Sequence, residues 1–212
     1  MKKILLIYFL SFHAISELTL EITQGTEDPY RVAIIKFSGA DKVTTDIQKV
    51  VFDNLLRTGE FTIFNNEDLL SIPQIEEDIV FNDFRILDID FLVMGKVEDD
   101  GLNIAVEYQV FDISKAKKIR TSTVYGIPNK NRQLAHYVSD GIYQEITGIP
   151  GIASTKILYV TEDNNFKLLI SDADGSNEQV LLESTEPIIS PSWSPDSKKV
   201  AYVSFETGIA KV

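Results

Sequence analysis

The side chains that could carry out chemistry in this chain are carboxylates and hydroxyls, because cysteine is absent and histidine occurs only twice. Thiolate ligands, disulfides, a cysteine nucleophile and a multi-histidine metal site are therefore excluded. The sequence also contains no G-x-S-x-G nucleophile elbow, no phosphate-binding glycine loop and no H-E-x-x-H pair. Any acid–base or cation-binding role must fall to acidic residues.

Alternating oxygen donors occur at Asp172, Asp174, Ser176 and Glu178, a pattern that superficially resembles a calcium-binding loop. A helix-flanked calcium loop needs glycine at its sixth position and a bidentate glutamate at its twelfth. Here Gly175 falls fourth, and the flanking residues are strand-like. Turn formation, which Asp and Gly favour, explains these residues better, so no metal site is predicted.

Two acidic clusters, at residues 76–78 and 98–100, consist of adjacent residues on expected loops and would not converge on a cleft. We interpret them as solvated charge rather than as paired catalytic carboxylates. His136 lies one residue outside the apolar stripe of an expected helix and has no identifiable catalytic partner. A surface or packed histidine is the default interpretation, and no catalytic residue, cofactor or metal ligand is predicted.

The composition describes a globular chain with an acidic surface. Of 212 residues, 44% belong to the hydrophobic set and 25% are charged, which is enough for one or two domains with a core. Lys and Arg number 20 against 32 Asp and Glu, a net charge of -12, and no stretch is densely basic. Nucleic acid and anionic lipid surfaces are therefore poor partners.

The first sixteen residues are arranged like a secretory signal peptide. Lys2 and Lys3 precede the apolar run 4–10, and Ala14 and Ser16 place small residues before a cleavage site. The alternative is a membrane anchor, but a spanning helix needs about 20 apolar residues and this run is shorter. We expect export to the periplasm, cleavage after residue 16 and no membrane insertion of the mature chain.

The segment after the expected signal peptide alternates polar and apolar residues over 17–23, the period of a half-buried strand, and we treat 17–29 as a terminal arm. An α/β domain is predicted over 30–150. Its first helix should bury Val43 and Leu55 and begin at Asp41 or Thr44, and a helical turn is expected at 67–70 and a short helix at 81–87. Its closing helix should bury Leu134, Val138, Ile142 and Ile146. Strands are expected at 30–37, 61–64, 91–97, 102–110 and 118–125.

Residues 148–151 (Gly-Ile-Pro-Gly) punctuate the chain, and we place a domain boundary there. The following residues, 151–212, contain short strand-like runs separated by turn-forming residues. Four strands within so short a stretch predict one blade of a β-propeller. These strands are expected at 157–161, 166–171, 179–183 and 199–205.

The motif Asp-Ala-Asp-Gly at 172–175, followed by Ser-Pro-Ser-Trp-Ser-Pro-Asp and Ala-Tyr within 190–202, resembles the repeat of TolB-type β-propellers. In physical terms, Pro195 and Asp196 would form a tight turn, Trp193 would fill space between blades, and Ala201 and Val203 would lie on the packed face. The signature residues are Asp172, Asp174, Gly175, Trp193, Pro195, Asp196, Ala201 and Tyr202.

The order of the segments, with a signal peptide, an arm, an α/β domain and then this repeat, resembles the TolB family of the Tol-Pal system over the whole chain. That family carries a six-bladed propeller, whereas this sequence ends at Val212, just past the first expected blade. We therefore expect a fragment or the product of a truncated gene. A complete one-blade protein is the alternative.

The resemblance implies a periplasmic, non-enzymatic protein that links TolA to the lipoprotein Pal. It would support outer-membrane integrity, constriction at division and the import of macromolecules such as colicins. Pal would dock on the propeller, which is doubtful here because most blades are missing, while the arm would exchange between a docked position and TolA. An ordinary edge strand or frayed end is the alternative for the arm. The resemblance places TolA binding on Glu17, Leu18, Thr19, Leu20, Glu21, Ile22 and Thr23.

Two other functions stay open. The same repeat precedes catalytic domains in propeller peptidases, so the chain could be the front end of a periplasmic hydrolase, although such a protein needs a further catalytic domain. The α/β domain could also bind a small ligand, but no residue pattern marks a pocket for one.

Overall fold

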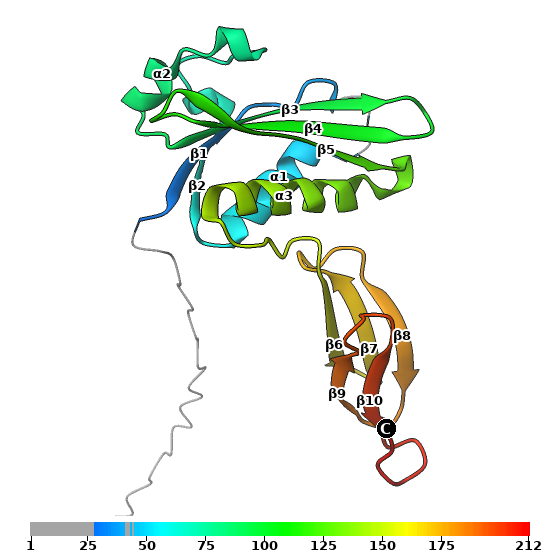
Figure 1. The fold of residues 1–212 in the computed structure, drawn as a ribbon. Helices are drawn as coiled ribbons and strands as arrows, with labels where there is room; N and C mark the ends of the chain where they lie inside the picture. Colours follow the sequence, from blue (N-terminus) through cyan, green and yellow to red (C-terminus); the bar gives the residue numbers. More distant parts are fainter. Residues whose placement is uncertain (1–27, 41–42, 44) are drawn as a thin grey trace, which may run out of the picture.

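The computed structural model describes residues 28–40, 43 and 45–212 (Figure 1). The expected signal peptide and residues 17–23 of the expected arm lie outside the described residues. Among the described residues, no helix combines the length and apolarity needed to cross a membrane.

The α/β unit (residues 30–147) is built on one mixed sheet of five strands. These are β1 (Tyr30–Ile34), β2 (Phe61–Phe64), β3 (Phe91–Asp99), β4 (Ile104–Asp112) and β5 (Lys117–Gly126). Their order is β2-β1-β3-β4-β5, with β1 parallel to both β2 and β3 and the other pairs antiparallel. This confirms the predicted mixed sheet with flanking helices.

Helices cover the sheet on both sides (Figure 1). One face packs against α1 (Ile47–Arg57) and α3 (Asn131–Thr147), and part of the other packs against α2 (Phe81–Ile86). Alternate residues of β3 enter the two cores, which explains the nearly continuous apolar run at 91–97. Short 3₁₀ helices complete the unit: η2 (Asn66–Asp68), η3 (Glu76–Asp78) and η4 (Pro128–Lys130).

The start of α1 differs from the prediction. Asp46 caps the helix, and its side chain accepts a hydrogen bond from the backbone N–H of Lys49 at 2.9 Å. Asp41 and Thr44, the predicted caps, lie outside the described residues. Several Asp and Thr residues precede the apolar stripe, and the sequence pattern does not decide which one begins the helix.

The second strand of the hairpin between β3 and β4 also begins later than the predicted residue 102. Asp100 accepts hydrogen bonds from the backbone N–H groups of Leu102 and Asn103, at 2.8 and 2.6 Å. This turn takes Leu102 out of the strand and leaves it 79% exposed, so β4 starts at Ile104.

Helix α3 is buried on two sides. The predicted stripe of Leu134, Val138, Ile142 and Ile146 enters the core under the sheet, as expected. Ala135 is buried in the same core, whereas His136 and Ser139 are buried on a side of the helix that the apolar stripe does not cover. Gly148, in the left-handed conformation at φ 76°, ends the helix and turns the chain away from it.

The C-terminal strands (residues 156–204) correct the predicted blade. Five strands are present, and they form two sheets rather than a single four-stranded one. The run at 188–193 was missed as a strand because its apolar start is followed by three Ser or Pro residues in a row, Pro191 among them. One sheet is β6 (Lys156–Glu162), β7 (Phe166–Asp172) and β8 (Gln179–Ser184), and the other is β9 (Ile188–Trp193) and β10 (Val200–Ser204).

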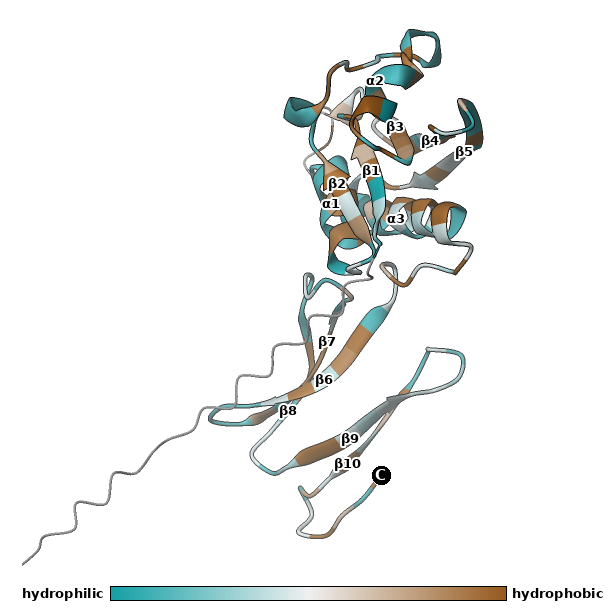
Figure 2. Cartoon of the chain, turned by 90° about the vertical axis from the view of Figure 1, so that its left-hand side faces the viewer, coloured by the Kyte–Doolittle hydropathy of each residue, from teal (hydrophilic) through white to brown (hydrophobic). Residues whose placement is uncertain are grey.

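The two small sheets lie against one another, with β9 next to β6 and β7 (Figure 2). Leu168 and Leu169 of β7 and Ile188 of β9 are the buried apolar residues of these strands. Ala201, predicted on the packed face, is exposed, and Val203 is half-buried. The reason is that β10 pairs only with β9 in the described part of the chain. The strands are consistent with part of a propeller rather than with a closed one.

Candidate functional site

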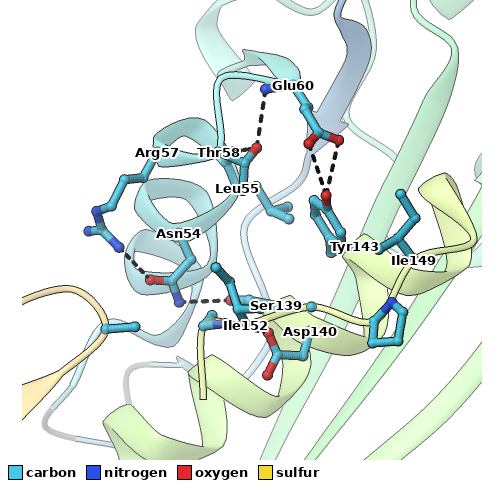
Figure 3. Close-up of a pocket in the computed structure, with 14 residues that line it drawn as sticks. Asn54, Leu55, Arg57, Thr58, Glu60, Ser139, Asp140, Tyr143, Ile149 and Ile152 are labelled. Carbon is cyan, nitrogen blue, oxygen red and sulfur yellow. Dashed lines mark hydrogen bonds between the residues drawn. The ribbon is translucent and has the colours of Figure 1, made fainter. Parts of the chain in front are cut away.

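Hydrogen bonds and ion pairs gather where α3 meets the segment 148–155 and the turn between β7 and β8. We call this region the junction. It contains a groove of about 380 Å³ between α1, α3 and the connecting segment (Figure 3). Its lining is largely apolar and includes Leu55, Tyr143, Ile149, Ile152 and Ala173.

The connecting segment is held tightly against α3. The Asp140 carboxylate accepts hydrogen bonds from the backbone N–H groups of Ala153 and Ser154, at 2.6 and 3.0 Å. A Cβ atom at Gly151 would lie 2.5 Å from the Cα atom of Asp140, so only glycine allows this approach. One carboxylate of α3 therefore fixes the point where the chain enters the C-terminal strands.

A charged cluster next to the groove joins α3 to the β7–β8 turn. Arg132 donates through Nε to the Asp174 carboxylate at 2.9 Å and also contacts it through Nη2. Lys156 of β6 pairs with Asp172, which also accepts a hydrogen bond from the Asn177 amide at 2.6 Å. The Asp172 and Asp174 side chains are 5% and 1% exposed, whereas the Lys156 and Arg132 side chains are 43% and 35% exposed. The carboxylates are therefore buried, and their cationic partners reach solvent.

His136 of α3 occupies the centre of this cluster and is 1% exposed. Its Nε2 atom lies 3.6 Å from Asp172 Oδ2 and 3.7 Å from Asp174 Oδ2. Its Nδ1 atom lies 2.9 Å from the side-chain nitrogen of Asn54 on α1. The ring therefore touches groups from α1 and from the β7–β8 turn at once.

The junction shifts the pKa values of its ionisable groups. Burial acts to raise the pKa of Asp174, but hydrogen bonds from Ser176 and from the Arg132 guanidinium outweigh it and lower the pKa to about 2. Asp172 behaves in the same way: burial opposes ionisation, yet Lys156 and Asn177 hold its pKa below the ordinary value. Burial lowers the pKa of His136 despite the two nearby carboxylates. The site thus favours two ionised carboxylates and a neutral imidazole.

The far end of the groove lies beside the first described strand. The Tyr143 hydroxyl donates to the Glu60 carboxylate, with distances of 3.0 and 3.1 Å to its two oxygens (Figure 3). Burial and this carboxylate raise the pKa of Tyr143. The backbone N–H of Tyr30 donates to the Glu60 carbonyl at 2.9 Å, so β1 begins next to the groove.

The residues predicted as sites lie in separate places. Residues 17–23 of the arm lie outside the described residues. Pro195 and Asp196 lie in the turn between β9 and β10, where the Ser194 hydroxyl and the Lys198 N–H donate to Asp196 at 2.6 and 3.2 Å. Trp193 at the end of β9 and Tyr202 in β10 are half-buried.

The oxygen-rich run at 172–178 does not converge as a calcium loop would. Asp172 and Asp174 turn inward to the junction, whereas Glu178 is exposed and contacts the Tyr159 hydroxyl. Turn formation is confirmed: Gly175 has a φ of 80°, and the Ser176 N–H donates to Asp174 at 2.9 Å. The acidic clusters at 76–78 and 98–100 remain surface charge, with Lys118 paired to the first and Lys96 to the second.

The sequence interpretation missed the junction itself. His136 is packed, which agrees with one of its two default readings, but its partners were not identified. A signal was available, because Arg132, His136 and Ser139 recur at helical spacing beside the main apolar stripe. A second stripe of this kind predicts a second partner for the helix.

Family models match both parts of the chain. A model described as the TolB amino-terminal domain matches residues 18–119, and one described as the TolB beta propeller domain matches residues 143–212. The chain belongs to the TolB family. Arg132, His136 and Asp140 lie between the two matched segments, and Asp172 and Asp174 lie within the second.

Individual TolB relatives agree with this assignment. The chain is 39% identical over 197 residues to the Tol-Pal system protein TolB of Alcanivorax borkumensis, covering 90% of this chain and 45% of the relative. The protein of the same name from Alkalilimnicola ehrlichii is 36% identical over 201 residues, with 91% and 47% covered. The crystal structure of TolB from Acinetobacter baumannii superposes with a TM-score of 0.79 at 33% identity, covering 90% of this chain and 47% of that one. The chain thus spans about half the length of these TolB relatives.

Proposed function

We propose that the chain is a periplasmic, non-enzymatic component of the Tol-Pal envelope complex. The observation that carries this proposal is the match to both the amino-terminal and the propeller models of TolB, in that order along the chain. The relatives are named as Tol-Pal system proteins, and the signal-like sequence at 1–16 supports export. The role we propose is protein–protein contact that supports outer-membrane integrity, constriction at division and colicin import.

The two proposed partners would use different parts of the chain. TolA would bind the arm at residues 17–23, which alternates Leu18, Leu20 and Ile22 with polar residues. Such an alternating segment can add as a strand to the edge of a partner's sheet. Pal would bind the propeller side, to which the described residues contribute the strands from β6 to β10.

We further propose that the junction groove is the docked position of the arm when TolA is not bound. The arm precedes Tyr30, whose N–H contacts Glu60 at one end of the groove. Extended chain covers about 3.3 Å per residue, so the seven steps from Thr23 to Tyr30 span at most about 23 Å. The apolar lining suits the apolar side of the arm.

The central experiment is calorimetric titration of the chain beginning at Glu17 with the periplasmic C-terminal domain of TolA. A second protein lacks residues 17–23, and it should show no binding heat. Within the arm, Leu20→Ala should weaken binding more than the neighbouring Glu21→Ala. Equal affinity with and without residues 17–23 would contradict the assignment of TolA binding to the arm.

Docking in the groove is tested separately by filling it. Ala153→Phe places a ring in the groove, so the arm should lose its docked position and TolA affinity should rise, because the competing state is removed. Ala210→Phe, at an exposed position near the C-terminal end, is the matched control and should leave TolA affinity unchanged. Unchanged affinity in Ala153→Phe would contradict docking in the groove while leaving TolA binding itself intact.

A further inference from the structure

The imidazole ring of His136 has one buried nitrogen without a hydrogen bond. His136 Nε2 is inaccessible to solvent and makes no hydrogen bond within the described part of the chain. It faces two carboxylate oxygens at 3.6 and 3.7 Å, beyond hydrogen-bond distance but close enough for strong electrostatic attraction. The other ring nitrogen, Nδ1, is hydrogen-bonded to the side chain of Asn54. Whether Nδ1 donates or accepts in this bond determines which ring nitrogen carries the proton.

The orientation of the Asn54 amide follows from its neighbours. Arg57 donates through Nη1 to Asn54 Oδ1 at 3.2 Å, and a guanidinium has only donors, so Oδ1 is the oxygen. The amide nitrogen then has two hydrogens, and it has two neighbours at 2.9 Å, Ser139 Oγ and His136 Nδ1. The Ser139 hydroxyl uses its own hydrogen on the Ala135 carbonyl at 2.8 Å. Both amide hydrogens are therefore donated, and His136 Nδ1 accepts one of them.

A neutral imidazole whose Nδ1 accepts must carry its proton on Nε2. That proton points at Asp172 and Asp174 on the β7–β8 turn. The histidine thereby extends a chain of polar contacts from Arg57 and Asn54 on α1, through α3, to the C-terminal strands.

The surrounding charges favour the neutral ring. Two carboxylates, Asp172 and Asp174, face two cations, Lys156 and Arg132, and the nearby Asp140 is satisfied by backbone N–H groups. A second ring proton would sit on Nδ1 and would oppose the Asn54 amide hydrogen. Burial adds to this cost, in line with the lowered pKa of His136.

The same contacts disfavour a metal ion, although one nitrogen of His136 and one oxygen each of Asp172 and Asp174 lie within 4.8 Å of one another. Coordination through Nε2 would move the ring proton to Nδ1, against the donor from Asn54. It would also compete with Arg132 and Asn177, which donate to the same Oδ2 atoms that face the ring. Because Arg132 and Asn177 already donate hydrogen bonds to these carboxylates, a cation would add little stabilisation.

We propose that His136 is a neutral latch, protonated on Nε2, that holds the C-terminal strands in one orientation on the α/β unit. It acts by presenting one N–H to the paired carboxylates of the β7–β8 turn. This role is independent of which partner the chain binds.

The tautomer is measured by nitrogen-15 NMR of the imidazole rings in the full chain, which has only two histidines. The signal lost in His136→Asn identifies His136. The latch predicts a protonated Nε2, an unprotonated Nδ1 and no titration near pH 6.5, about where a free histidine is half protonated. Protonation on Nδ1, titration at or above that pH, or a shift of the signal on adding Zn²⁺ would overturn it.

Two substitutions separate the latch from simple packing. Gln places its amide near the position of Nε2 and can still donate to the carboxylates, whereas Asn reaches only the position of Nδ1. Amide hydrogen exchange in the turn 173–178 should be about tenfold faster in His136→Asn, which loses the electrostatic attraction between the ring N–H and the two carboxylates, and close to the original rate in His136→Gln. Equal exchange in His136→Asn and the unsubstituted chain, or equal acceleration in both variants, would overturn the latch.

Discussion

The α/β unit and the C-terminal strands use their apolar residues differently. In the α/β unit the central strands are covered by α1 and α3 on one face and partly by α2 on the other. The C-terminal strands bury Leu168, Leu169 and Ile188 but expose Ile157 and Ile189. One part of the chain thus carries a large apolar core, whereas the other buries few apolar side chains, is held by pairing among its strands, and is joined to α3 through the polar contacts of the junction.

The first prediction tests where the stability lies. Ile142 is fully buried between α3 and the sheet, whereas Ile189 on β9 is 46% exposed. Ile142→Ala should lower the free energy of unfolding by about 2–5 kcal/mol, because it leaves a cavity. The matched Ile189→Ala should change it by less than about 1 kcal/mol, since it loses little buried area. Urea unfolding measures both, and similar losses would contradict the comparison.

The second prediction concerns the ion pair across the junction. Arg132→Ala leaves the Asp174 carboxylate buried and short of a partner, and should cost about 1.5–3 kcal/mol in thermal unfolding. Arg120→Ala is the control, because Arg120 is half exposed and lies 3.9 Å from Glu145, and such a surface pair is worth about 1 kcal/mol or less. Equal costs would mean that the junction adds no stability of its own.

The third prediction is a pH dependence that belongs to the junction. The folded chain holds the pKa of Asp174 at about 2, below the value of about 3.9 for an unfolded aspartate. Its contribution to stability is therefore complete above pH 4 and is lost as the pH falls from about 4 to 2, since the unfolded chain binds the proton first. Asp174→Asn should flatten the melting temperature over this window. An unchanged slope would contradict the assigned role of Asp174.

The smallest expected effect lies inside the α/β unit. Asp46→Ala removes the cap of α1 and should cost about 1 kcal/mol in urea unfolding. Asp53→Ala, which removes only an exposed pair with Lys49 on the same helix, should cost about 0.5 kcal/mol or less. A larger loss at Asp53 than at Asp46 would mean that the helix begins elsewhere.

The sequence predicts the α/β unit well because its signals are local. The alternation along 104–110 and the stripe from Leu134 to Ile146 each reflect one buried face, and the structure confirms both. The exact ends of the elements were less accurate, since competing turn residues surround Asp46 and Leu102. The prediction that the C-terminal strands form one four-stranded sheet was also wrong. Pairing between strands depends on contacts that the pattern of a single strand does not encode.

The junction could not be predicted in the same way. Aspartate is common in turns, so the turn alone accounts for the residue types of Asp172 and Asp174. The sequence therefore gives no sign that both side chains also contact α3. His136 meets Asn54 across 82 residues and Asp174 across the connecting segment, and no local pattern links these positions. A prediction that α3 is buried on two sides would have indicated that the helix contacts a second part of the chain.

The most direct test of the account is the distance between the two parts of the chain. Because the sequence has no cysteine, spin labels can be placed on Lys117→Cys at the start of β5 and Thr161→Cys in β6, both exposed positions, and the distance distribution measured by electron paramagnetic resonance. We predict one narrow distribution, which broadens when Arg132→Ala is added. A broad distribution in the doubly labelled chain without Arg132→Ala would contradict a junction that fixes the C-terminal strands on the α/β unit.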